Sequence, residues 1–135
     1  MGAWDVGTFD NDTASDWAYE LHGAEDLALV ESAIEAVLIT ASDYLDADEA
    51  CEALAACEVI ARLRGRWGVR SPHTEAVDAW VEAHPLSPSD ELLAHARQAI
   101  DRILAEASEL RELWDESDER DQWRAAVAEL RARLA

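Results

Sequence analysis

Apolar residues recur at intervals of three and four along most of the chain, the spacing that places them on one side of an α-helix. No segment alternates between apolar and polar residues as a half-buried β-strand would. We therefore expect an all-α protein. The intervals predict helices over about residues 12–22, 24–45, 47–64, 74–84, 88–116 and 118–134.

The predicted helix over residues 47–64 is apolar in almost every direction. A helix of this kind is usually surrounded by other helices, so we expect it at the centre of the fold. The preceding helix, over residues 24–45, instead has a single apolar stripe. That stripe consists of Leu27, Val30, Ile34, Val37, Ala41 and Tyr44.

Capping residues predict where several helices begin. Asn11 or Asp12 is the expected N-cap of the first helix. Ser87, followed by Pro88 at the first helical position, is expected to open the helix that extends to about Glu116. That helix has an alternative break near Ser108, and Asp118 is the expected cap of the last helix.

Residues 1–11 contain two glycines and two large aromatic residues but no helical period. We expect an ordered irregular segment that packs on the core. A chain of 135 residues has the size of one domain. The prediction is a single helical domain over residues 1–135, in which a loop (1–11) precedes a compact bundle of five to six helices (12–135).

The formal charge of −19 is unevenly distributed. Fifteen acidic residues and no Arg or Lys precede Arg62, whereas all eleven arginines follow from that position onward. Such a surface repels nucleic-acid phosphates and anionic membranes, which leaves either a basic partner or simply solubility as the role of this charge. The high Ala content and the absence of Lys indicate either the coding bias of a GC-rich genome or adaptation to salt. With no membrane-spanning run and no signal-peptide pattern, a bacterial cytoplasm is expected.

The start of the first predicted helix is one candidate site. Polar and aromatic side chains there could form a pocket with an aromatic wall. They are Trp4, Phe9, Asn11, Asp12, Asp16 and Trp17. Helix capping, first-turn carboxylates and closure of the core explain the same residues, and we prefer that interpretation.

Glu58 is a second candidate because it lies in the most apolar predicted helix. A buried carboxyl group can act as an acid or base. Arg62 follows at i+4, however, and a structural ion pair is the preferred interpretation. Arg64, Arg66 and Arg70 extend a basic cluster around Trp67 that could bind an anion or a partner, although neutralisation of the acidic half is the simpler explanation.

Metal, cofactor and catalytic motifs are not predicted. The acidic stretch from Asp43 to Glu49 lacks the spacing and the glycine of a calcium loop. The four histidines do not have zinc-ligand spacing, and no nucleophile elbow or phosphate-binding glycine loop is present. Cys51 and Cys57, six residues apart on one helix, cannot form a disulfide with each other and are expected to be reduced.

The N-terminal run has a distinctive pattern, Gly2-Ala3-Trp4 followed by Gly7, Phe9, Asn11-Asp12, Ala14 and Asp16-Trp17. It resembles the start of the bacterial proteins grouped as domain of unknown function 4259, and residues 108–117 are similar to the same family. The resemblance covers the whole chain and implies an Ala-rich helical fold of this length. Because the family is uncharacterised, it implies no activity. Asp5 stands where many members have Gly, so the loop is expected to differ there.

Three functions follow as hypotheses. The first is a non-enzymatic acidic interaction or accessory protein, in a sharper form an inhibitor or immunity-type protein for a basic partner. The second is a small-ligand-binding protein or enzyme with a pocket at the N-terminal residues. The third is a structural homo-oligomer that uses the long helix, so the chain is expected to be a monomer or a homodimer.

Overall fold

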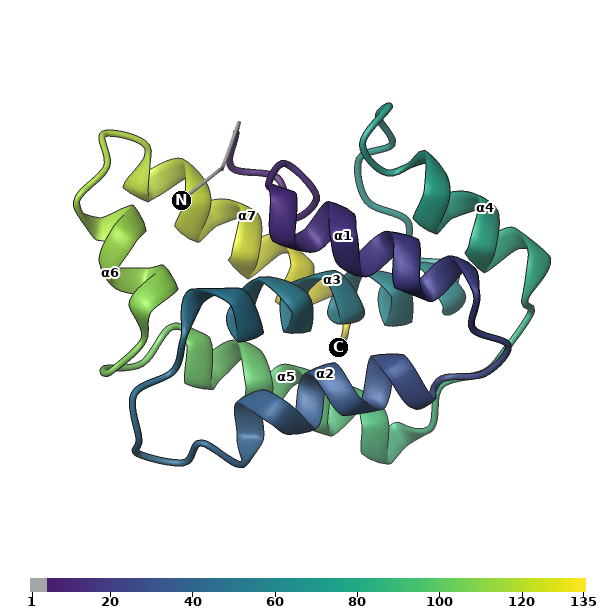
Figure 1. The fold of residues 1–135 in the computed structure, drawn as a ribbon, viewed down its shortest axis with the longest axis horizontal. Helices are drawn as coiled ribbons and strands as arrows, with labels where there is room; N and C mark the ends of the chain where they lie inside the picture. Colours follow the sequence, from purple (N-terminus) through teal and green to yellow (C-terminus); the bar gives the residue numbers. More distant parts are fainter. Residues whose placement is uncertain (1–4) are drawn as a thin grey trace.

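The computed structural model describes residues 5–135, and in this range the chain forms seven α-helices and no β-strand (Figure 1). The all-α prediction is confirmed, but the helices number seven rather than five to six. They are α1 (Asp12–His22), α2 (Ala28–Leu38), α3 (Ala47–Leu63), α4 (Glu75–Ala83), α5 (Asp90–Ile103), α6 (Glu109–Asp115) and α7 (Arg120–Arg133).

Helix α3 is the centre of the fold, as its all-round apolar pattern predicts. It packs against each of the other six helices, and α1 and α2 lie on either side of it (Figure 1). Every residue from Ala53 to Arg62 is buried. The many alanines in this segment let neighbouring helices approach closely, because a methyl group adds little width to the helix.

The prediction of one helix over residues 24–45 is wrong at both ends. Helix α2 ends at Leu38, and the chain then turns through Ala41, which has a φ of +48°. The guanidinium of Arg102 donates to the carbonyl oxygens of Ala41 (2.6 Å) and Asp43 (2.5 Å). These carbonyls are therefore unavailable for helical bonds. Ala41 and Tyr44 are exposed rather than part of the buried stripe.

The alternative break near Ser108 is confirmed, because α5 and α6 are separate helices. Ala107 has a φ of +57°, and the segment around Leu45 pairs with the chain at this point. The amide of Leu45 donates to the carbonyl of Ala107 (2.8 Å), and the amide of Glu109 donates to the carbonyl of Leu45 (2.9 Å). This short backbone pairing replaces the helical bonds that a continuous helix would need.

Of the predicted caps, only Asn11 is confirmed. Its Oδ1 accepts a hydrogen bond from the amide of Ala14 (2.8 Å). The fifth helix begins after Ser89, whose hydroxyl accepts from the amide of Leu92 (3.1 Å), so the prediction of Ser87 is wrong. The last helix begins at Arg120 and not directly after Asp118.

No helix in the described part of the chain combines the length and the apolar character needed to cross a membrane.

Candidate functional site

The N-terminal loop, residues 5–11, lies against the bundle and separates two small cavities. Its turn is closed in two ways, because the Asp10 carboxylate accepts from the amide of Gly7 (3.1 Å) and the Asp10 amide donates to the Gly7 carbonyl (3.1 Å). A side chain at Gly7 would collide with the Asp10 carboxylate. Phe9 is only 2% exposed and anchors the loop in the core.

The predicted site residues around α1 do not gather in one pocket. Phe9 and Trp17 are buried in the core, whereas Asp12 and Asp16 are exposed. Asn11 caps α1 and its amide donates to the carbonyl of Thr8 (3.2 Å). Trp4, the remaining member of the predicted set, lies outside the described residues.

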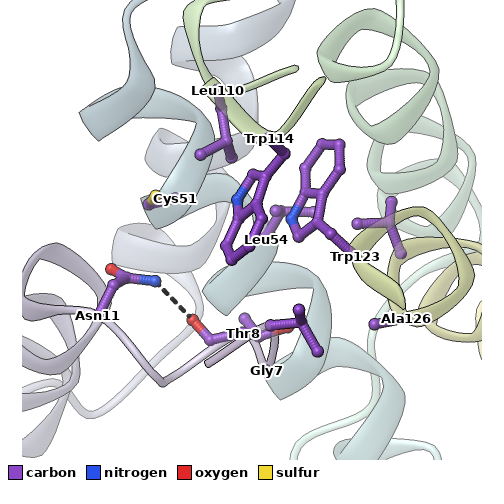
Figure 2. A pocket seen from close by; sticks show the side chains of 11 residues that line it. Gly7, Thr8, Asn11, Cys51, Leu54, Leu110, Trp114, Trp123 and Ala126 are labelled. Atoms are coloured by element: carbon purple, nitrogen blue, oxygen red, sulfur yellow. Dashed lines mark hydrogen bonds between the residues drawn. The ribbon is translucent and has the colours of Figure 1, made fainter. Parts of the chain in front are cut away.

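Asn11 borders an apolar crevice between the loop and helices α3, α6 and α7 (Figure 2). Its walls include the indoles of Trp114 and Trp123, which stack with ring centroids 6.0 Å apart and an angle of 8° between their planes. The crevice has a volume of about 20 Å³, which is room for about one water molecule. It cannot take an organic ligand unless the loop or the indoles move.

A charged cavity of about 120 Å³ lies on the other side of the loop. The loop residues Gly7 to Asp10 form one wall, and the others are formed by α3, α7 and the segment before α4, with Val69, Ser71 and Thr74. The two predicted regions, the N-terminal run and Glu58, therefore meet here. The charged side chains that line this cavity are Asp10, Glu58, Arg62, Glu129 and Arg133.

Glu58 is shared by two arginines. Its Oε2 accepts from Nη1 of Arg62, one helical turn away, which confirms the predicted pair. Its Oε1 accepts from Nη2 of Arg133 (2.5 Å), and Oε2 also accepts from Nη1 of Arg133 (3.2 Å). Because both carboxylate oxygens are occupied by fixed cations, this arrangement favours a structural role over proton transfer.

Arg62 is 2% exposed, and all three of its nitrogens are hydrogen-bonded. Nε donates to Oδ1 of Asp78 (2.8 Å), and Nη2 donates to the carbonyl of Val69 (2.8 Å). Burial lowers the pKa of the Arg62 guanidinium, and the hydrogen bond that it donates to Asp78 opposes that shift. Thr74 completes the network by donating to Oδ2 of Asp78 (2.7 Å).

Asp78 and Arg133 are not predicted from the sequence because they lie 16 and 75 residues from their partners Arg62 and Glu58. A local signal exists for Asp78. It follows Thr74 by one turn on the same face as the buried Val77 and Val81, where a carboxylate needs a partner. Arg133 has no comparable signal, because long-range pairing is set by how α7 packs across α3.

The surface of the acidic half is a separate feature from these cavities. Asp12, Asp16 and Glu20 project from α1 at intervals of one turn and are exposed. The start of α3 lies beside the start of α1, since Thr13 donates to Asp48 (2.9 Å). We call the carboxylates of this α1–α3 surface the acidic ridge: Asp12, Asp16, Glu20, Asp48, Glu49 and Glu52.

The pKa of Glu52 shows the effect of the closely spaced carboxylates of the acidic ridge. Partial burial raises its pKa above the usual range of a glutamate, and the negative charges of Glu20, Asp48 and Glu49 raise it further. The ridge carboxylates thus repel one another, and no arginine of residues 5–135 forms an ion pair with any of them.

The basic cluster does not neutralise this half of the molecule. The guanidinium of Arg70 lies 4.1 Å from the ring centroid of Trp67 and pairs with Glu82 (2.7 Å) and Asp78 (3.5 Å). Arg62 lies 5.8 Å from the same ring centroid. These arginines therefore stabilise the loop that leads into α4, and among the described residues Glu58 is the one first-half acid that pairs with any of them.

Within residues 5–135, no group of three or more His, Cys, Asp and Glu side chains lies close enough together to hold a metal ion. Both cysteines are free and buried. Burial raises the pKa of the Cys51 thiol and that of the Cys57 thiol to about 12 each, so neither is a thiolate at neutral pH.

Comparisons with known proteins place the chain in a family but assign no activity. No curated protein and no solved structure gives a significant match. One family model, described as a domain of unknown function (DUF4259), matches residues 2–126, which is most of the chain. The chain therefore belongs to the DUF4259 family, as its N-terminal pattern predicts.

Proposed function

We propose that this protein is a non-enzymatic interaction protein that presents its acidic half to a basic partner protein. One observation carries the proposal. Of the fifteen acidic residues before Arg62, only Glu58 forms an ion pair with an arginine in the described part of the chain. The other arginine ion pairs in this range are made with acids of the second half, so most of the negative charge of the first half is not cancelled by ion pairs within the chain.

An uncancelled acidic surface acts on a basic partner before contact. It steers the partner during diffusion and raises the association rate, and salt screens this effect. A bacterial cytoplasm is the proposed place of action. The sharper form of the proposal is an inhibitor or immunity-type protein that covers the basic groove of a nuclease, where carboxylates stand in for nucleic-acid phosphates.

A small-ligand role at the N-terminal loop has weaker support. The loop does close over a charged cavity that contains Arg62 and Arg133. The nitrogens of both guanidinium groups, however, already donate to protein oxygens. A ligand there would have to displace existing ion pairs, whereas a partner of the exposed carboxylates would not.

An affinity pull-down from lysate of the producing cells tests the proposal, run at low and high salt with wild-type bait and two variants. The test variant neutralises five first-half carboxylates (D12N, D16N, E20Q, E31Q and E35Q). The matched control neutralises five exposed second-half carboxylates (E75Q, E106Q, E116Q, D118N and E119Q). We expect a basic protein that wild type and the control retain at low salt, that high salt releases and that the test variant fails to retain. No captured protein, or capture unaffected by salt and by the test variant, would contradict the proposal.

A further inference from the structure

A groove runs between α2 and α5, which lie side by side in the fold (Figure 1). Its volume is about 460 Å³, which corresponds to about fifteen water molecules at liquid density. It is therefore far larger than the crevice and the charged cavity beside the N-terminal loop. The residues that define this α2–α5 groove are Glu31, Ile34, Glu35 and Leu38 from α2, Ser89 before α5, and Glu91, Leu92 and His95 from α5.

The rims of the α2–α5 groove are acidic. Glu31 and Glu35 follow one another by one turn on α2, and Glu91 stands on the α5 side. All three are exposed, and none has an arginine within ion-pair distance in the range 5–135. The potential inside the groove is thus negative and available to a cation from outside.

The floor of the groove is apolar. Ile34, Leu38 and Leu92 line it; Ile34 and Leu92 are themselves buried, so the partly buried Leu38 supplies its accessible apolar surface. Ile39, the next residue along the chain, is 73% exposed. Apolar surface of Leu38 can therefore be buried further inside the groove, whereas Ile39 lies outside its lining.

We propose that the α2–α5 groove binds a basic amphipathic helix of the partner protein. Arg or Lys side chains one turn apart on such a helix would match the spacing of Glu31 and Glu35, and its apolar side would cover Leu38. The inference rests on the proposed function, since it names the part of the acidic half that docks the partner. It also explains why charge alone would not set specificity, because the apolar floor selects for a partner with helical apolar spacing.

Fluorescence anisotropy with a labelled helical peptide tests the inference. The probe is a peptide of about 14 residues with Leu at intervals of three and four and Arg at the other exposed positions. A second peptide has Ser in place of every Leu. The groove variant is E31Q/E35Q/E91Q, and the matched control, with the same change in charge on the acidic ridge, is D12N/D16N/E20Q. Circular dichroism checks that both variants remain helical.

We expect the groove variant to weaken binding of the Leu peptide about tenfold or more and the ridge control to weaken it only about twofold. Leu38→Ser should weaken binding of the Leu peptide but leave the Ser peptide unaffected. Equal losses in both charge variants, a larger loss in the ridge control, or no binding by wild type would overturn the groove assignment. The proposed function would survive those results if the salt-sensitive pull-down still captures a basic protein, and both would fail if it does not.

Discussion

At the scale of single residues, the close packing around the Glu58 carboxylate involves two arginines and a neighbouring glycine. Glu58 receives Arg62 from its own helix and Arg133 from α7. Gly68 lies against that second arginine, and a Cβ at Gly68 would be 2.7 Å from Nη2 of Arg133. A side chain here would therefore require the Arg133 guanidinium to shift, whereas the backbone of Gly68 does not require a positive φ.

Gly68→Ala is expected to destabilise the fold by about 1–3 kcal/mol, because the new methyl group pushes the Arg133 guanidinium away from Glu58. Gly23→Ala is the matched control, since its Cβ would meet nothing closer than a carbonyl oxygen at 3.8 Å. Urea unfolding of both variants measures the difference. Equal stability of the two variants would show that Arg133 adapts without cost.

Glu52→Gln is expected to stabilise the protein slightly at pH 7, by about 0.5 kcal/mol, since it removes one of several repelling carboxylates. The folded-state pKa of Glu52 is raised, so the native state binds this proton more tightly than the unfolded state. Its ionisation therefore costs stability as pH rises through the interval between the unfolded and the raised folded pKa. The gain from the variant should be present at pH 7 and disappear at pH 3, and thermal unfolding at both values measures it. A gain that persists unchanged at pH 3 would contradict a charge effect.

At the scale of elements, Arg102 explains why two predicted helices are shorter than their apolar patterns. Its guanidinium donates to four backbone carbonyls, two in the loop after α2 and two in the loop after α5. Ala41 and Ala107 stand in these loops with positive φ, a conformation that L-residues seldom adopt. The apolar spacing and the capping residues predict the middle of each helix. Hydrogen bonds from one arginine to two distant loops leave no local pattern in the sequence, so the helix ends are not predicted.

Arg102→Ala is expected to destabilise the fold by about 2–4 kcal/mol, because four carbonyls lose their donor at once. Ala41→Gly and Ala107→Gly are expected to act in the opposite direction, each by about 1 kcal/mol, because glycine adopts positive φ without strain. Chemical unfolding of the three variants measures the change in the free energy of unfolding, which should fall for Arg102→Ala and rise for the two glycine variants. An Arg102→Ala variant as stable as wild type would show that the loops are held by the backbone pairing at Leu45 alone.

At the scale of the whole molecule, the sequence predicts the fold better than the site. The stripe of α1 (Ala14, Trp17, Ala18 and Leu21) is buried as its spacing indicates, and the apolar α3 is central. The meeting of the N-terminal loop with Glu58 depends on how α7 crosses α3, and the sequence contains no pattern for that crossing. Charge, in contrast, is additive along the chain, which is why the acidic half is recognisable before the fold is known.

The burial of Cys51 and Cys57 in the folded protein also predicts how slowly their thiols react. Cys57 is fully buried and Cys51 is 7% exposed, and burial raises each thiol pKa to about 12. Both should therefore resist a disulfide-exchange reagent at pH 8 in the folded protein and react fully in concentrated guanidinium. Absorbance of the released thiolate follows the reaction. Fast labelling of either cysteine in the native protein would mean that α3 opens locally.

The uncancelled negative potential of the first half is the property on which the proposed function depends, and the association rate with the captured partner measures it most directly. Stopped-flow mixing of the two purified proteins at increasing salt gives this rate. We expect it to fall about tenfold or more from low to high salt, and to fall much less for the variant that neutralises the five first-half carboxylates. An association rate of wild type that does not change with salt would contradict an electrostatic role for the acidic half.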